Sequence, residues 1–113
     1  MSSVGEPGLV ISQTTAADGA TELALSGYID LATVGVLADA LAIAFDGARA
    51  IRLNLADLTF LDSTGLREFL QGYHRAEAEG VGYQVVNPQG HIRQVLEVTG
   101  TYDYLTEGLE PTN

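Results

Sequence analysis

The sequence predicts an α/β fold in which helices pack on a β-sheet. In the later half of the chain, segments with alternating apolar residues are followed by segments whose apolar residues recur at helical spacing. This alternation favours one sheet covered by helices. The 113 residues, 46% of them hydrophobic, suit one compact domain. We expect that domain at residues 9–106, between loose, polar termini at 1–8 and 107–113.

The first elements predicted are two strands joined by a tight turn. Residues 9–15 and 21–29 have strand character, and Asp18-Gly19 between them is a turn dipeptide. A helix follows, for which Thr33 can act as the N-cap. Its apolar side comprises Val34, Leu37, Ala38, Leu41 and Phe45.

The second half of the chain alternates strands with helices. We predict a strand at 50–56, a helix from near Thr64 to about Glu79, and a strand at 83–86. A third, short helix follows a loop and ends before Gly100. Residues 102–105 are expected to add a short edge strand. The apolar face of the third helix comprises Ile92, Val95 and Leu96.

Charge and composition exclude several classes of partner and chemistry. The formal net charge of −10, from 15 acidic and 5 basic residues, disfavours direct contact with nucleic acid or with an anionic membrane. The absence of cysteine rules out disulfides, thiol nucleophiles and cysteine metal sites. The chain carries no long apolar span and no N-terminal export signal, so we expect it in the cytoplasm.

Residues 61–66 are the most informative stretch, because they place two hydroxyls and a carboxylate where a strand turns into a helix. The N-terminus of a helix has free backbone N–H groups and the positive end of the helix dipole, so it accommodates a phosphate on Ser63 or Thr64. The same position suits a capping side chain, and Asp62, Ser63 or Thr64 can fill that role. Both interpretations stay open at this point.

Catalysis and metal binding have little support in the sequence. A hydrolase that used Ser63 would need a histidine nearby, and His74 lies 11 residues along the same predicted helix, roughly 16 Å away. His91 can come closer, but no Gly-x-Ser-x-Gly elbow surrounds Ser63. The two histidines are isolated, and no phosphate-binding glycine loop is present. We therefore expect no catalytic residue, no metal and no cofactor.

Three motifs resemble a known family. Residues 58–66, read as Leu-Thr-Phe-Leu-Asp-Ser-Thr-Gly-Leu, resemble the signature of the anti-anti-sigma factors of the STAS domain family. Residues 25–30 followed by Thr33 resemble its second-strand segment, and Asn87-Pro88 with the helix after it resembles its final loop and helix. The resemblance runs from about residue 9 to 105 and implies a small mixed β-sheet flanked by about three to four helices.

The resemblance implies partner switching without catalysis. Members of the family bind an anti-sigma factor that is also a serine kinase, and so free a sigma factor for transcription. The kinase then phosphorylates the serine directly after the aspartate, here Ser63, and a separate phosphatase restores it. Asp62 and Asp30 match the family's acidic positions near that serine, and Thr64 stands where many members have a second serine. Tyr28 departs from the pattern, since an acidic residue is common there, so the choice of partner is expected to differ.

These considerations give a testable set of site residues. Ser63 is the expected phosphorylation site, with Thr64 as the alternative. Around Ser63 we expect a partner-facing rim of Asp30, Asp62, Thr64, Gly65 and Arg67. Each also has a plain structural interpretation: a carboxylate can cap, Gly65 can permit close packing, and Arg67 can be a solvated helix residue. Phe45, Phe60, Phe69 and Tyr73 are expected in the core, and Tyr28 is not clearly inside.

A second interpretation of the function comes from the wider family. STAS domains also serve in transporters and in multi-protein stress-sensing complexes. On that interpretation the chain is a soluble accessory subunit of a lipid transporter or of a stress-sensing complex.

Overall fold

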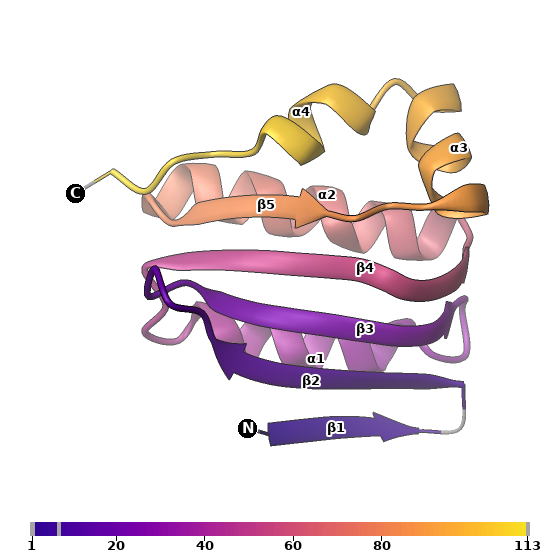
Figure 1. Cartoon of the computed structure of the whole chain (residues 1–113), viewed down its shortest axis with the longest axis horizontal. Helices are drawn as coiled ribbons and strands as arrows, with labels where there is room; N and C mark the ends of the chain where they lie inside the picture. The colour runs from indigo at the N-terminus through magenta and orange to yellow at the C-terminus, as the bar shows by residue number, and fades with distance from the viewer. Residues whose placement is uncertain (1, 7, 113) are drawn as a thin grey trace.

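The computed structural model of the chain describes residues 2–6 and 8–112, and side chains from residue 8 onward. It has an α/β fold with a mixed sheet and four helices, which confirms the predicted fold class (Figure 1). In chain order the elements are β1 Ser2–Glu6, β2 Leu9–Thr15, β3 Thr21–Ile29, α1 Val34–Phe45, β4 Ala50–Leu61, α2 Ser63–Glu79, β5 Gly82–Val86, α3 Gly90–Val98 and α4 Tyr102–Glu107.

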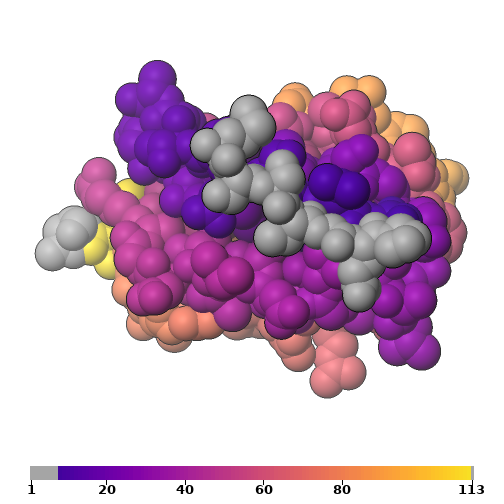
Figure 2. Space-filling model, turned by 90° about the horizontal axis from the view of Figure 1, so that it is seen from below, coloured from indigo at the N-terminus to yellow at the C-terminus, as the bar shows by residue number. Residues whose placement is uncertain are grey.

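The five strands lie in the sheet in the order of the sequence. β1, β2 and β3 pair antiparallel, whereas β3, β4 and β5 pair parallel. Each parallel pair is joined through a helix, and both of these helices, α1 and α2, lie on the same face of the sheet (Figure 1). α4 lies beside β5, and α3 packs past the end of β5 against the last part of β4. Figure 2, which views the β1 side, shows a surface built mostly by the first half of the chain.

The core lies between the sheet and the α1–α2 layer. Alternate residues of the central strands, such as Leu23 on β3 and Leu53 on β4, are fully buried there. The residues between them are half-buried on the opposite face and are mostly polar, as Glu22, Arg52 and Asn54 illustrate. The period of two in the sequence therefore decides which side chains reach the helices.

Both ends of the chain differ from the loose segments that we expected. Residues 2–6 form β1, which pairs with β2 in a register that sets Val4 opposite Ile11. At the other end, Leu109 exchanges two backbone hydrogen bonds with Tyr83, and the Thr112 N–H donates to the Gly80 carbonyl. Backbone pairing needs no apolar periodicity, so composition alone misses it. Met1, Pro7 and Asn113 of the two predicted termini lie outside the described residues.

Residues 102–105 form the start of α4 and not the predicted edge strand. Leu105 is fully buried and donates its N–H to the Thr101 carbonyl, while Tyr104 is exposed. Tyr102 and Leu105 are three apart, so a helical turn directs both toward the core, and Tyr102 is half-buried. Tyrosine is common in strands, but the packing of Tyr102 and Leu105 against the core favours the helix here.

β4 is longer than predicted, and its extra length carries the chain to the candidate site. The strand continues past residue 56 to Leu61, with register shifts against β3 between Ala24 and Ser26 and between Gly27 and Tyr28. These irregularities place Ala56 and Asp57 side by side as exposed residues, which breaks the alternation used to predict the strand's end. The strand ends at Leu61, and α2 begins two residues later.

Candidate functional site

Asp62 links the end of β4 to the start of α2 and caps the helix. Its backbone is extended, and its Oδ1 accepts hydrogen bonds from the N–H groups of Thr64, at 2.9 Å, and Gly65, at 3.2 Å. The Thr64 hydroxyl donates to the same oxygen at 2.5 Å. Of the three residues considered as caps, Asp62 is therefore the one whose side chain caps the helix.

The environment of Asp62 favours its charged form. The hydrogen bond from the Thr64 hydroxyl is the main cause that lowers the pKa of Asp62, and the backbone N–H groups of Gly65 and Thr64 add to it against the opposing effect of burial. The positive end of the dipole of α2 acts in the same sense. A carboxylate therefore stands beside Ser63 at neutral pH.

Ser63 and Thr64 differ in what their hydroxyls do. Thr64 is half-buried, and its hydroxyl is committed to Asp62. Ser63 is the first residue of α2 and is exposed, and in the described part of the chain no hydrogen-bond partner is found for its hydroxyl. Of the two hydroxyls, that of Ser63 is the accessible one, whereas that of Thr64 is engaged.

The start of α2 is fastened to the end of β3. The Asp62 N–H donates to the Ile29 carbonyl at 3.2 Å, and Ile29 and Leu61 are register partners in the sheet. Gly65 is buried against both of these side chains. Gly65 therefore lies on the sheet-facing side of the first turn of α2, where it supports the helix, and its role in a partner-facing rim stays a prediction.

A turn at the end of β3 presents Asp30. The Asp30 Oδ1 accepts from the N–H groups of Ala32, at 2.9 Å, and Thr33, at 3.2 Å. The Thr33 hydroxyl accepts from the Asp30 N–H at 3.0 Å and donates to the Tyr28 carbonyl at 3.0 Å. Thr33 occupies the N-cap position of α1 as predicted, but its hydroxyl makes no cap bond to the helix because it is used in this turn.

The sheet brings the predicted site residues to one end, where the strands β3 and β4 finish. Because Ile29 pairs with Leu61, the residues that follow, Asp30 and Asp62, leave the ends of adjacent parallel strands. Ser63, Thr64 and Gly65 make up the first turn of α2 at that end. Arg67 is exposed one helical turn beyond Ser63, and within residues 8–112 no ion pair is found for it.

Two aromatic residues, Phe60 and His91, meet at the same end of the sheet. Phe60 was expected in the core, but its side chain is 43% exposed and stacks on the ring of His91, with centroids 5.1 Å apart and planes at 5°. The His91 Nε2 lies 3.3 Å from the Leu61 carbonyl oxygen. A ring nitrogen that faces a carbonyl must donate its proton to bond it, so this contact does not provide Ser63 with a general base.

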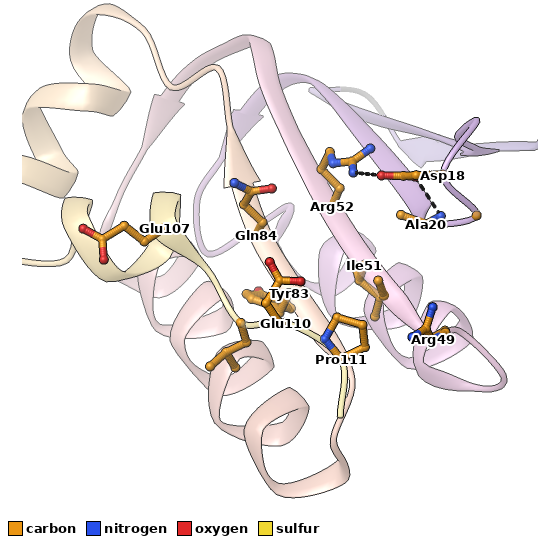
Figure 3. A pocket seen from close by; sticks show the side chains of 13 residues that line it. Asp18, Ala20, Arg49, Ile51, Arg52, Tyr83, Gln84, Glu107, Glu110 and Pro111 are labelled. Atoms are coloured by element: carbon orange, nitrogen blue, oxygen red, sulfur yellow. Dashed lines mark hydrogen bonds and ion pairs between the residues drawn. The ribbon is translucent and has the colours of Figure 1, made fainter. Parts of the chain in front are cut away.

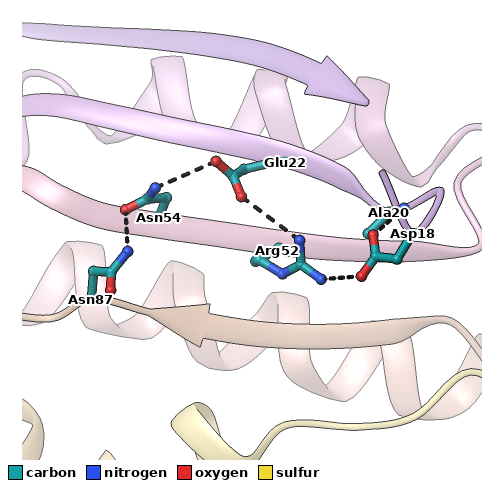
Figure 4. Close-up of polar contacts among 6 residues, drawn as sticks. All are labelled: Asp18, Ala20, Glu22, Arg52, Asn54 and Asn87. Carbon is teal, nitrogen blue, oxygen red and sulfur yellow. Dashed lines mark hydrogen bonds and ion pairs between the residues drawn. The ribbon is translucent and has the colours of Figure 1, made fainter. Parts of the chain in front are cut away.

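The opposite end of β4 carries a row of polar contacts on the uncovered face of the sheet (Figure 4). Arg52 pairs with Asp18 at 2.6 Å and approaches Glu22 at 3.8 Å. Asn54 donates to Glu22 at 3.3 Å and accepts from Asn87 at 3.1 Å. The hydrogen bond from Arg52 is the main cause that lowers the pKa of Asp18. The row ties β3, β4 and the residue after β5 together.

A cavity of about 470 Å³ lies beside this row, at the end of β4 remote from Ser63 (Figure 3). Arg49 and Arg52 line it together with Glu107, Glu110 and Asp18. The three carboxylates outnumber the two arginines, so the lining is acidic overall. None of the predicted site residues lines the cavity. The cavity therefore does not form part of the candidate site.

Residues 2–6 and 8–112 contain neither a metal-binding cluster nor a membrane-spanning helix. No group of three or more histidine, cysteine, aspartate or glutamate side chains there is placed to hold a metal ion. In that part of the chain no helix combines the length and the apolar character needed to span a bilayer.

Comparisons with known proteins agree on one family. A family model described as Mlab, STAS domain, matches residues 12–107. An anti-sigma-B factor antagonist from Staphylococcus aureus (strain NCTC 8325 / PS 47) is 30% identical over 101 residues, which cover 87% of this chain and 94% of that protein. The crystal structure of an anti-sigma factor antagonist from Mycobacterium paratuberculosis matches with a TM-score of 0.74 at 26% identity, covering 96% of this chain and 92% of that chain.

A more distant match concerns the fold alone. The unphosphorylated form of SpoIIAA, an anti-sigma factor antagonist from Bacillus, has a TM-score of 0.68 at 23% identity. The match covers 83% of this chain and 84% of SpoIIAA.

Proposed function

The chain belongs to the STAS domain family, and from that premise we propose that it is an anti-sigma factor antagonist switched off by phosphorylation of Ser63. The family confirms the resemblance first noted in residues 58–66. The antagonist function is supported by the relative from Staphylococcus aureus, which is similar over nearly its whole length. On this proposal the protein acts by binding and performs no catalysis of its own.

The partner in this proposal is an anti-sigma factor with serine kinase activity. It docks on the edge where Asp30, Asp62 and Thr64 surround Ser63, with Arg67 one turn along α2. Gly65 contributes from below, since its missing side chain lets the helix lie close to β3 and so sets the height of Ser63 above the sheet. Binding holds the anti-sigma factor away from its sigma factor and thereby permits transcription.

The single observation that carries the proposal is the contrast between the two hydroxyls. Ser63 is exposed with its hydroxyl free, and it follows the carboxylate of Asp62 directly. Thr64, the alternative site, would first have to release its 2.5 Å hydrogen bond to Asp62. A phosphatase acting on phosphorylated Ser63 has the same open access.

Phosphate on Ser63 changes binding without refolding the domain. It adds about −1.5 to −2 charges at neutral pH, at a helix start that tolerates an anion. A kinase that modifies Ser63 must hold nucleotide phosphates against that hydroxyl, so a phosphate on Ser63 meets like charge at that point. A cost of several kcal/mol at such an interface corresponds to roughly a hundredfold loss of affinity or more, at about 1.4 kcal/mol for each factor of ten.

Phosphate mapping tests the assignment of the site. The purified protein is mixed with each candidate anti-sigma kinase and ATP, and the modified residue is located by mass spectrometry. We expect phosphate on Ser63, none in Ser63→Ala, and undiminished phosphate in Thr64→Val. Loss of phosphate in Thr64→Val with retention in Ser63→Ala would transfer the assignment to Thr64.

The same experiment with candidate kinases distinguishes the anti-sigma factor antagonist from the accessory subunit of a transporter. If no candidate kinase binds or modifies the protein, and it co-purifies with a transport ATPase, the accessory-subunit interpretation replaces the anti-sigma factor antagonist.

A further inference from the structure

Three aromatic rings form a band on the face of the sheet that α1 and α2 leave uncovered. The band lies near the ends of β3 and β4, which lead into the candidate site. Tyr28 on β3 and Phe60 on β4 are register partners and are 40% and 43% exposed. His91, at the start of α3, stacks on Phe60. On the other side the Tyr28 ring lies over Gly8, where an added Cβ would come within 2.5 Å of the Tyr28 Cζ. We call Tyr28, Phe60 and His91 the aromatic band.

The band is held in place by the surrounding structure. The Tyr28 carbonyl accepts from the buried Thr33 hydroxyl at 3.0 Å, and the Tyr28 N–H donates to the Gly8 carbonyl at 2.8 Å. The contact of His91 with the Leu61 carbonyl and the parallel stack fix the other end. Large exposed rings on a fixed backbone lose little conformational entropy on binding, which is why aromatic residues are enriched at protein interfaces.

Carboxylates predominate around the band, with the exposed Arg67 one helical turn beyond Ser63 and Arg93 on α3 paired with Glu97. Residues 26–35 and 53–66, which contain both strand ends and the two turns, include three carboxylates and no lysine or arginine. Asp57 is exposed, and Asp30 and Asp62 are half-buried at the ends of their strands. A cation placed on the band would meet three carboxylates and the faces of aromatic rings, and both attract it.

We infer that the aromatic band and the carboxylates Asp30, Asp57 and Asp62 form a docking surface for a basic, arginine-bearing segment of the anti-sigma factor. The inference rests on the proposed function and adds the chemistry of the partner to it. Arginine fits because its flat guanidinium stacks on aromatic faces while its N–H groups bond carboxylates. A second copy of this chain, with its own net charge of −10, is repelled from the same surface.

The test measures the affinity of a purified anti-sigma kinase that binds the wild-type protein. Tyr28→Ala and Phe60→Ala are each expected to weaken binding about tenfold or more, as truncation of a central aromatic contact does. The matched control is Tyr104→Ala, which removes an aromatic residue that is 37% exposed on α4 and contacts Tyr73, well along α2 from Ser63. The control should bind within about twofold of wild type, and thermal melting verifies that all three variants fold.

A titration with short peptides tests whether arginine is the group that the aromatic band binds. The isotope-labelled protein is titrated by NMR with acetyl-Ala-Arg-Leu-Arg-Ala-amide and with the same peptide carrying citrulline, a neutral analogue, at both arginine positions. The arginine peptide should shift the ring resonances of Tyr28, Phe60 and His91, and the citrulline peptide should shift them much less. Equal shifts with both peptides, or none with either, would overturn the inference of a cationic partner.

The outcomes separate this inference from the proposed function. If Ser63→Glu weakens kinase binding while Tyr28→Ala and Phe60→Ala bind as wild type, the switch stands and the docking surface is wrong. If the two aromatic variants weaken binding and Ser63→Glu does not, the docking surface stands and the phosphorylation switch falls. If no kinase binds the wild-type protein, the proposed function loses its partner, and the peptide titration alone decides whether the band binds arginine.

Discussion

Gly65 in the first turn of α2 lies against Ile29 at the end of β3 so closely that a side chain has no room. A Cβ built on Gly65 would lie 2.7 Å from the Ile29 Cγ2 and closer still to the Leu61 Cδ1. Real Cβ atoms do not approach neighbours this closely, so any side chain must push α2 away from the sheet. The position of Ser63 is therefore set by a glycine that a partner does not need to touch.

Gly65→Ala is expected to destabilise the fold by about 1–3 kcal/mol, because the added methyl overpacks the contact with Ile29. Gly35→Ala on α1 is the matched control, since nothing lies within 4 Å of a Cβ built there. In a helix that change should stabilise the protein by up to about 1 kcal/mol. Urea unfolding measures both, and a gain in stability for Gly65→Ala would contradict the packing described.

Removing the cap should weaken α2 at its start. Asp62→Ala loses the hydrogen bonds to the Thr64 and Gly65 N–H groups, and we expect the free energy of unfolding to fall by about 1 kcal/mol. Urea unfolding at neutral pH gives this value. An unchanged stability would mean that the Asp62 carboxylate contributes nothing as a cap.

The same carboxylate should make stability depend on pH. Because its pKa is lowered on folding, the charged form of Asp62 stabilises the native state above the ordinary pKa of an aspartate, and that contribution is lost as the pH falls through the lowered pKa. Asp62→Asn keeps an acceptor oxygen but cannot titrate. The gap in unfolding free energy between wild type and Asp62→Asn should therefore narrow from neutral to acidic pH, whereas a constant gap would contradict the lowered pKa.

Arg67 is placed to interact with a negative charge at position 63. The two residues are four apart on α2, and the coupling of Ser63→Glu with Arg67→Ala in a double-mutant cycle should be about 0.3–0.5 kcal/mol. The ion pair of Arg75 with Glu79, at 2.8 Å on the same helix, is the internal reference. Coupling that is absent at 63 and 67 but present at 75 and 79 would show that Arg67 points elsewhere.

Tyr83 fixes the middle of α2 to β5. Its buried hydroxyl donates to the Phe69 carbonyl at 2.8 Å, and burial raises its pKa well above the ordinary value. A Cβ on Gly72 would lie 2.5 Å from that hydroxyl oxygen. Tyr83→Phe should cost about 1 kcal/mol, and Gly72→Ala should cost less in the Tyr83→Phe background than in wild type. Additive costs would show that the hydroxyl does not cause the clash.

The sequence predicts best where local chemistry and burial agree. The start of α2 is predicted correctly near Thr64, because Asp62 is a good capping residue and Leu66 and Phe69, three residues apart, place one face of the helix in the core. The predicted strand end at residue 29 and the predicted helix start at Thr33 likewise leave room for the turn after β3. These features depend on neighbours in the chain, so they are visible without the fold.

The features that the sequence did not reveal depend on contacts between distant segments. β1 and the strand-like pairing of Leu109 are made by backbone hydrogen bonds, which leave no mark in side-chain periodicity. The exposure of Phe60 follows from register shifts between β3 and β4, and its stack on His91 joins two residues that are 31 apart in the chain. A propensity for strands at Tyr102 and Tyr104 was overridden by the packing of Leu105.

The most direct test of the central claim is the affinity of one anti-sigma kinase for two forms of this protein, unmodified and phosphorylated on Ser63, measured by isothermal titration calorimetry. We expect tight binding of the unmodified form and a loss of roughly a hundredfold or more for the phosphorylated form, at about 1.4 kcal/mol for each factor of ten. Equal affinity for the two forms would contradict a switch at Ser63.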